Sequence, residues 1–206
     1  MKVLLINPAI REWAKPNIVP LGLGYLASVL RGGGHEVEIM DINAYRWSRE
    51  EVEQRIKSAD FDVAGIGGIV TVYKYVKWLA GVIKKHHGGK KLVVGGSVGT
   101  SIPHIILAKT AADVVCIGEG EVTILELMDA FAGKRELASV NGIWFRGKGG
   151  VAQATKPRSP IEDTDTLPHP STIAPDLVML ASPAMREHGL IYDCASKRFL
   201  SPRTPA

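Results

Sequence analysis

Short apolar runs alternate with longer stretches of helical periodicity along most of the chain. Residues 2–7, 62–66, 92–94 and 114–117 are rich in Val, Ile and Leu, the composition of strands that are buried on both faces of a parallel sheet. Residues 36–40 (EVEIM) instead alternate polar and apolar positions, which is typical of a strand near a sheet edge. The pattern predicts five strands.

Helical spacing of apolar residues fills the intervals between these runs. The predicted helices cover residues 21–30, 48–58, a segment after Thr71, part of 97–110, and 121–131. Ser48 and Glu51 form a capping-box signature, and Thr71 is the expected cap of the third helix. Regular βα alternation predicts an α/β fold, a Rossmann-like (flavodoxin-type) doubly wound sheet with five parallel strands. Residues 141–145 and 151–155 predict an appended C-terminal β-hairpin.

The character of the chain changes after this hairpin. Residues 1–156 are expected to form the Rossmann-like domain, hairpin included. Residues 157–206 begin with a stretch rich in Pro, Ser, Thr and Asp that has no periodicity, which indicates a linker. A weak helix is predicted at 177–185, within a tail that we expect to be poorly ordered from residue 171 onward.

Composition limits the classes of partner. Of the 206 residues, 46% are hydrophobic and 22% charged, as in a soluble globular protein. The net charge is +4, and the basic runs 84–87 and 90–91 flank one predicted helix end, where cations suit the helix dipole. No stretch resembles a signal peptide or reaches transmembrane length. We therefore expect a cytoplasmic protein with neither nucleic acid nor membrane as a partner.

Glycines follow three of the predicted strands directly. They occur as Gly67-Gly68, as Gly95-Gly96, and within the segment 118–121 (GEGE). In open α/β sheets, ligands bind beyond the carboxyl ends of the strands, near the point where strand order reverses. Glycine in such loops lets backbone approach a ligand, or simply makes a tight turn. The pattern predicts a ligand-binding face without identifying the ligand.

Catalytic motifs are few. The sequence has no GxSxG, P-loop or HExxH, and its histidines are dispersed; His104 is the one placed to meet a ligand. Glu119 and Glu121 are either paired carboxylates for acid–base chemistry or acidic residues that favour the start of the next helix. Asp41 ends the second strand, where a nucleotide-binding fold holds a ribose hydroxyl.

Six segments in order carry a resemblance to a known family: LLINP, PLGLGYLASVLRGGGHEVEIMD, DVAGIGG, KLVVGGSVGTSIPH, DVVCIGEGEVTILEL and NGIWFR. Together they resemble the N-terminal cobalamin (B12)-binding domain of B12-dependent radical S-adenosylmethionine enzymes. The resemblance covers about residues 1–170. It implies that the domain binds cobalamin, with the nucleotide tail of the cofactor between the sheet and the helices.

The resemblance also implies which residues hold the cofactor. Gly67, Gly68 and Ile69 occupy the family's Ser-x-Leu element, with glycine in place of serine, and Gly95-Gly96 matches its Gly-Gly pair. The full expected set is Asn7, Pro8, Leu21, Gly22, Gly67, Gly68, Ile69, Val70, Gly95, Gly96, Ser97, Gly118, Glu119, Gly120 and Glu121.

Two motifs of related enzymes are absent. The first loop, NPAIREW, lacks the Asp-x-His-x-x-Gly motif that ligates cobalt, so binding without a histidine ligand is expected. The CxxxCxxC of a [4Fe–4S] cluster is also absent, because Cys116 and Cys194 lie far apart. The cluster and S-adenosylmethionine would therefore belong to a radical barrel, missing in cis or supplied in trans. Two alternatives are a degenerate docking module without a ligand and a small-molecule enzyme that uses Glu119 or Glu121.

Overall fold

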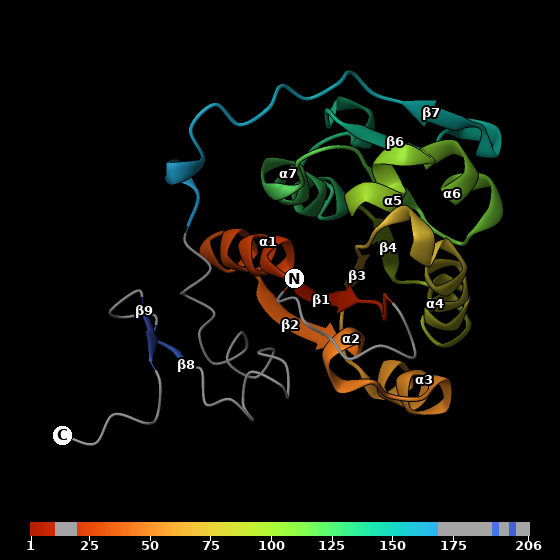
Figure 1. Ribbon diagram of the computed structural model, residues 1–206. Coiled ribbons are helices and arrows are strands. Elements are labelled where there is room, and N and C mark those ends of the chain that lie inside the picture. Colours follow the sequence, from red (N-terminus) through yellow and green to blue (C-terminus); the bar gives the residue numbers. More distant parts are fainter. Residues whose placement is uncertain (11–19, 169–190, 194–197, 201–206) are drawn as a thin grey trace.

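A seven-stranded sheet forms the centre of the molecule, in the order β2-β1-β3-β4-β5-β6-β7 (Figure 1). The computed structural model describes residues 1–10, 20–168, 191–193 and 198–200. The strands β1 (Lys2–Asn7), β2 (Glu36–Asp41), β3 (Val63–Ile66), β4 (Lys91–Val94) and β5 (Val114–Cys116) are parallel. The hairpin β6 (Ile143–Arg146) and β7 (Ala152–Ala154) extends the sheet antiparallel to β5. The predicted fold class is confirmed.

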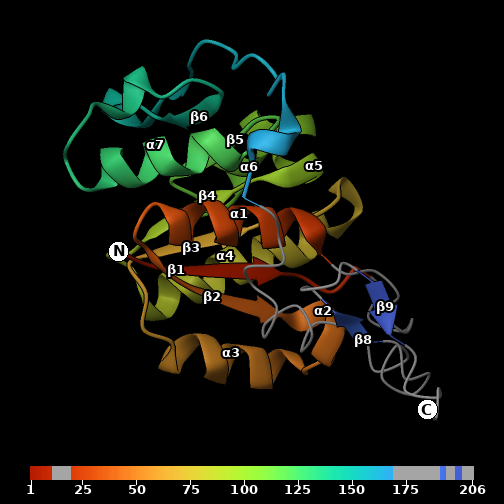
Figure 2. The same cartoon turned by 90° about the vertical axis from the view of Figure 1, so that its left-hand side faces the viewer.

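Helices cover both faces of the sheet. Helices α1 (Leu21–Gly32) and α7 (Glu121–Phe131) lie on one side. Helices α3 (Arg49–Ser58), α4 (Tyr73–His86) and α6 (Pro103–Lys109) lie on the other, and Figure 2 shows the same layers after a quarter turn. The short helices α2 (Ile42–Tyr45) and α5 (Gly96–Ser101) follow β2 and β4 at their carboxyl ends. None of the helices in the described ranges is long and apolar enough to cross a membrane.

The side chains of the apolar strands pack into two separate hydrophobic cores, one on each face of the sheet. In β1, Leu4 and Ile6 pack in the core under α3, α4 and α6, whereas Val3 and Leu5 pack in the core under α1 and α7. The same alternation separates Val94 from Val93 in β4. Because successive side chains of a strand point to opposite faces, a strand buried on both sides has to be apolar throughout.

Local details differ from the sequence prediction in three places. Thr71 does not cap α4; it lies inside the 3₁₀ turn η1 (Val70–Val72), and α4 begins without a side-chain cap. The single helix expected within 97–110 is broken at Ile102, and Pro103 begins α6. Helix α2, which was not predicted, is capped by the Asp41 carboxylate, which accepts from the amide of Ala44. The Ser48–Glu51 capping box is confirmed.

The stretch after β7, expected as a linker, runs back along the domain. The amide of Gly142 donates to the carbonyl of Lys156 over 2.8 Å, and Leu167 packs against the core under α1 and α7. A 3₁₀ turn, η4 (Thr164–Thr166), precedes Leu167. Further on, β8 (Ile191–Asp193) and β9 (Arg198–Leu200) pair antiparallel. The helix predicted at 177–185 and most of the expected tail lie outside the described residues.

Candidate functional site

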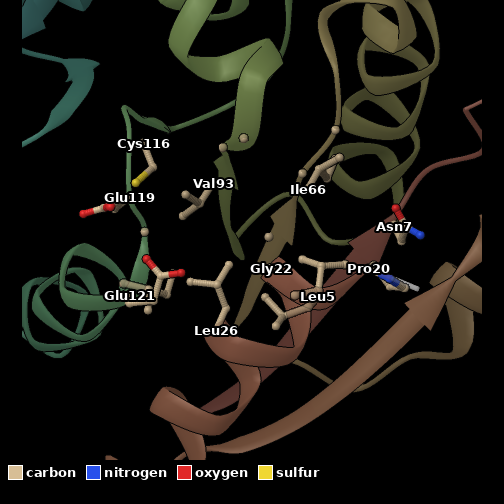
Figure 3. Close-up of a pocket in the computed structure, with 18 of the residues that line it drawn as sticks. Leu5, Asn7, Pro20, Gly22, Leu26, Ile66, Val93, Cys116, Glu119 and Glu121 are labelled. Atoms are coloured by element: carbon tan, nitrogen blue, oxygen red, sulfur yellow. The ribbon is translucent and has the colours of Figure 1, made fainter. Parts of the chain in front are cut away.

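A cavity of about 350 Å³ opens at the carboxyl ends of β1, β3, β4 and β5 (Figure 3). It lies on the face that carries α1 and α7, since Leu5 and Val93 of the sheet line it together with Leu23, Leu26 and Ile124. The connection after β1 leads to β2 on one side, and β3 pairs on the other side of β1. The cavity therefore sits at the topological switch point, where open α/β sheets bind ligands.

Glycines bring the loops of this cavity into direct backbone contact. Gly96 has a φ of 70°, and a Cβ built on it would lie 3.0 Å from both the amide nitrogen and the carbonyl oxygen of Gly68. The amide of Val98 also donates to the Gly68 carbonyl over 3.0 Å. A larger residue at 96 would force the two loops apart, so glycine here sets the distance between the ends of β3 and β4.

At the end of β1, a hydrogen bond between an amide and a carboxylate side chain fixes one residue of the cavity lining. Asn7, which lines the cavity, donates from Nδ2 to Oδ1 of Asp41 over 2.8 Å. Asp41 is 1% exposed, and this burial raises the pKa of its carboxyl group, whereas the hydrogen bonds from Ala44 and Asn7 lower it. The carboxylate thus orients Asn7 and caps α2. Asp41 is not among the cavity-lining residues, so the structure does not support its proposed contact with a ribose.

The two glutamates of the 118–121 loop have different surroundings. Oε2 of Glu119 accepts a hydrogen bond of 2.6 Å from the amide of Ile161, in the segment that follows the sheet. Oε2 of Glu121 is buried and has no hydrogen-bond partner among the described residues. In Figure 3 the Glu121 side chain points toward Leu26 and the cavity, and that of Glu119 points away. The two carboxylates therefore do not form a catalytic pair, and neither caps α7 through its side chain.

Cys116, the last residue of β5, lines the cavity. Its side chain is 7% exposed, and burial raises the pKa of the thiol to about 11. A thiol with so high a pKa is protonated at neutral pH and behaves as a small apolar group. Cys116 therefore adds to the apolar lining and is no nucleophile.

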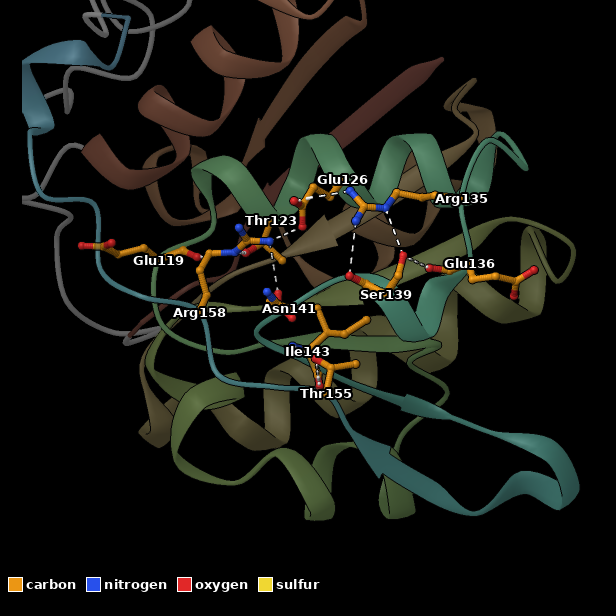
Figure 4. Close-up of polar contacts among 10 residues, drawn as sticks. All are labelled: Glu119, Thr123, Glu126, Arg135, Glu136, Ser139, Asn141, Ile143, Thr155 and Arg158. Carbon is orange, nitrogen blue, oxygen red and sulfur yellow. Dashed lines mark hydrogen bonds and ion pairs between the residues drawn. The ribbon is translucent and has the colours of Figure 1, made fainter.

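The segment 155–161 is attached to the same wall from outside (Figure 4). Nε of Arg158 donates to the hydroxyl of Thr123 over 2.8 Å, and its guanidinium pairs with Glu126. The Thr123 hydroxyl in turn donates to the Glu119 carbonyl over 3.3 Å. Three residues of the domain and the segment after it thus share one network next to the 118–121 loop.

The structure brings most of the predicted site residues together. Those that line the cavity are Asn7, Gly22, Gly67, Gly68, Gly95, Gly96, Gly118, Glu119, Gly120 and Glu121. Pro8, Leu21, Ile69, Val70 and Ser97 do not line it. Of these, Leu21, Ile69 and Val70 are apolar side chains 57%, 43% and 41% exposed at the starts of α1 and η1.

Sequence reasoning missed the apolar wall. It consists of Leu5, Leu23, Leu26, Gly65, Ile66, Val93, Cys116 and Ile124, and Pro20, at the end of the first loop, where a binding loop was expected, also lines the cavity. Each was assigned to a strand or a helix, or was left in a loop, and apolar periodicity alone does not distinguish core positions from cavity positions. The one usable signal was Gly22 in the first turn of α1, which is unfavourable for a helix and leaves space beside the sheet.

The described histidines lie away from the cavity. His35, His86, His87 and His104 are all absent from its lining, which leaves the expected ligand role of His104 without support. Within the described ranges no three His, Cys, Asp or Glu side chains come together as a metal site.

Comparison with known proteins identifies the domain. The model of the B12 binding domain family matches residues 9–128. An uncharacterised methyltransferase of Pyrococcus horikoshii is 33% identical over 176 residues, which cover 83% of this chain and 38% of the relative. A cytidylyl-2-hydroxyethylphosphonate methyltransferase of Streptomyces wedmorensis is 31% identical over 78% of this chain and 34% of the relative. The chain thus spans about a third of the length of these relatives.

Solved structures show the same fold. OxsB, a cobalamin-dependent S-adenosylmethionine radical enzyme with aqua-cobalamin bound, matches with a TM-score of 0.74 and 20% identity over 88% of this chain and 25% of that one. The radical S-adenosylmethionine methyltransferase TsrM of Kitasatospora setae, with cobalamin and a [4Fe–4S] cluster bound, matches with a TM-score of 0.66 and 20% identity over 82% of this chain and 31% of that one.

Proposed function

The chain belongs to the B12-binding domain family, related to cobalamin-dependent radical S-adenosylmethionine methyltransferases, and from this premise we propose that it binds cobalamin at the described cavity. The observation that carries the proposal is the glycine-lined, mainly apolar cavity at the switch point of the sheet. Its volume of about 350 Å³ lies within the range of small-molecule sites. It suits the nucleotide tail of cobalamin, because the much larger corrin ring has to remain outside.

The residues present fit both parts of the cofactor. The close approach of Gly68 and Gly96 leaves no side chain at the ends of β3 and β4, and Leu26 and Ile124 offer an apolar wall to a planar base. The exposed Leu21, Ile69 and Val70 would lie beneath the corrin, because they surround the carboxyl edge where the cavity opens. Leu21, Ile69 and Val70 therefore stay in the proposed site as rim residues, whereas the contacts expected for Pro8, which is buried, and for Ser97 stay predictions.

We further propose that binding does not use a histidine ligand. The proposal is supported by the first loop, residues 8–20, which contains no histidine. Gly67 replaces the serine of the family element, and a Cβ built on it would meet Leu23 at 3.8 Å, an ordinary contact. The glycines and the apolar wall thus act through shape and apolar contact. When bound, cobalamin supplies one-carbon transfer chemistry at cobalt.

The proposed domain division is residues 1–156 for the cofactor and 157–206 for the connection that follows. The cobalamin face would meet a radical barrel that holds the iron–sulfur cluster and S-adenosylmethionine, in cis or in trans. Both relatives are named as methyltransferases, which supports methyl transfer as the reaction of the assembly. A location in the cytoplasm stays a prediction. A small-molecule enzyme built on Glu119 and Glu121 is not favoured, because Glu119 is engaged by Ile161.

Titration with hydroxo- and methylcobalamin, followed by absorbance and calorimetry, tests the proposal. Gly22 lines the cavity, and a Cβ there meets nothing within 4 Å, so Gly22→Phe places a bulky side chain at the cavity without a clash at its Cβ. We expect saturable binding by the unaltered chain and at least a tenfold weaker affinity in this variant. The matched control is Gly81→Phe, since Gly81 is an exposed glycine of α4 with equal space outside the cavity. Absence of saturation by the unaltered chain would contradict the proposal.

A further inference from the structure

Polar side chains are few in the cavity, and each has a definable role. Among the residues that the structure describes, the polar side chains of the lining are Asn7, Glu119 and Glu121, apart from the Cys116 thiol. The Nδ2 of Asn7 is engaged by Asp41, and the Glu119 carboxylate is engaged by the amide of Ile161. Glu121 is the member of this set whose Oε2 is buried without a hydrogen-bond partner in the described part of the chain.

A buried carboxylate oxygen without a donor is unfavourable. Buried polar atoms in folded proteins are almost always hydrogen-bonded, and an exception calls for an explanation in the chemistry of the site. Figure 3 shows the Glu121 carboxylate beside Leu26, directed into the cavity from the start of α7. The missing donor would therefore come from whatever fills the cavity.

We infer that Glu121 accepts a hydrogen bond from a ribose hydroxyl of the bound cofactor's nucleotide tail. The inference rests on the proposed function and deepens it. In that tail the phosphate is anionic and only accepts hydrogen bonds, so a carboxylate disfavours it as a neighbour. The dimethylbenzimidazole base has no N–H group in cobalamin. The ribose hydroxyls are the donors of the tail, and they are neutral.

Glu121 then acts as a specificity-determining residue for the lower half of the cofactor. It would distinguish cobalamin from cobinamide, which keeps the corrin ring and its amides but lacks the ribose, the phosphate and the base. An acceptor that is left unpaired when the ligand lacks the matching donor gives strong discrimination. The glycines and the apolar wall accept no hydrogen bond through a side chain, so they do not detect whether the ligand carries a ribose hydroxyl.

The test compares two corrinoids on the full chain. Dissociation constants for hydroxocobalamin and for diaquocobinamide are measured by absorbance titration with the unaltered chain, with Glu121→Leu and with Glu121→Gln. Leucine removes the acceptor, and we expect it to weaken cobalamin binding about 10- to 100-fold while cobinamide binding changes less than about twofold. Glutamine keeps a neutral acceptor, so an intermediate loss is expected. Each variant's thermal unfolding midpoint without ligand shows that it is folded.

Three results would overturn the inference. Equal losses for the two corrinoids would place the partner of Glu121 on the corrin ring or its amides. An unchanged affinity for cobalamin in Glu121→Leu would show that the carboxylate makes no contact with it. If the unaltered chain bound neither corrinoid, the proposed function would fail and the inference with it, an outcome that differs from a failure confined to the variants.

Discussion

Arg158 donates a hydrogen bond of 2.8 Å from its guanidinium Nε to the hydroxyl of Thr123, which is fully buried in α7. The same guanidinium pairs with Glu126, so one side chain attaches the segment after the sheet to two points on the helix beside the cavity (Figure 4). A region that the sequence presents as a linker thus supports the wall of the candidate site.

Loss of this attachment should destabilise the domain. We expect Arg158→Ala to lower the free energy of unfolding by about 2 kcal/mol, because a buried hydroxyl and a partly buried carboxylate each lose one of their two partners. The control is Arg135→Ala. Arg135 also pairs with Glu126, at 3.3 Å, but its side chain is 32% exposed against 16% for Arg158, so a loss below about 1 kcal/mol is expected. Urea unfolding measures both, and equal losses would contradict the assigned role.

Gly96 should be the least replaceable of the loop glycines. Gly96→Ala places a Cβ 3.0 Å from two backbone atoms of Gly68 at a positive φ, so we expect a loss of about 2 kcal/mol or more in the free energy of unfolding. Gly118→Ala is the matched control, since its φ is 71° but a Cβ there meets nothing within 4 Å; about 1 kcal/mol is expected. Urea denaturation measures the loss of unfolding free energy in both variants, and the difference between them reports the contact of the new Cβ with Gly68. Equal losses in the two variants would contradict this role of Gly96.

Stability should depend on pH through Asp41. Burial raises the pKa of this carboxyl group in the folded state, so the folded protein binds the proton more tightly than the unfolded chain does. The resulting stabilisation is present below the ordinary pKa of 3.8 and is lost as pH rises through the folded pKa. Asp41→Asn removes the titration and keeps an acceptor for Ala44. We therefore expect the free energy of unfolding of Asp41→Asn, relative to that of the unaltered protein, to rise from pH 3 to pH 7. A difference that does not change with pH would contradict this.

The Cys116 thiol should react slowly with alkylating reagents. With a pKa of about 11 against about 8.5 for a free cysteine, its thiolate fraction at pH 8 is lower by more than about a hundredfold, and burial slows access further. Iodoacetamide labelling read by mass spectrometry on the Cys116 peptide measures this rate separately from Cys194. The same peptide in urea-unfolded protein is the control. Comparable rates in the folded and unfolded protein would show that the thiol is accessible.

Local sequence determined the framework of this protein. Runs such as residues 2–7 are apolar throughout because both faces of a central parallel strand are buried, and this requirement is visible without any neighbour. Gly95-Gly96 and the 118–121 loop marked the ligand face for a similar reason, since glycine directly after a strand has a local conformational meaning. The order of such segments also carried the resemblance that the family match confirms.

Only the tertiary structure decided the roles of side chains whose partners are distant in sequence. Glu119 and Glu121 are two residues apart and chemically identical, yet one meets the amide of Ile161 and the other faces the cavity. Asp41 has the sequence position of a ribose-binding carboxylate, but its Oδ1 accepts hydrogen bonds from Asn7 and from the amide of Ala44. The apolar wall from Leu26 to Ile124 arises where α1 and α7 meet over the sheet. Hydrophobic periodicity specifies which face a residue occupies, whereas the packing of separate elements determines whether that face is filled or left open.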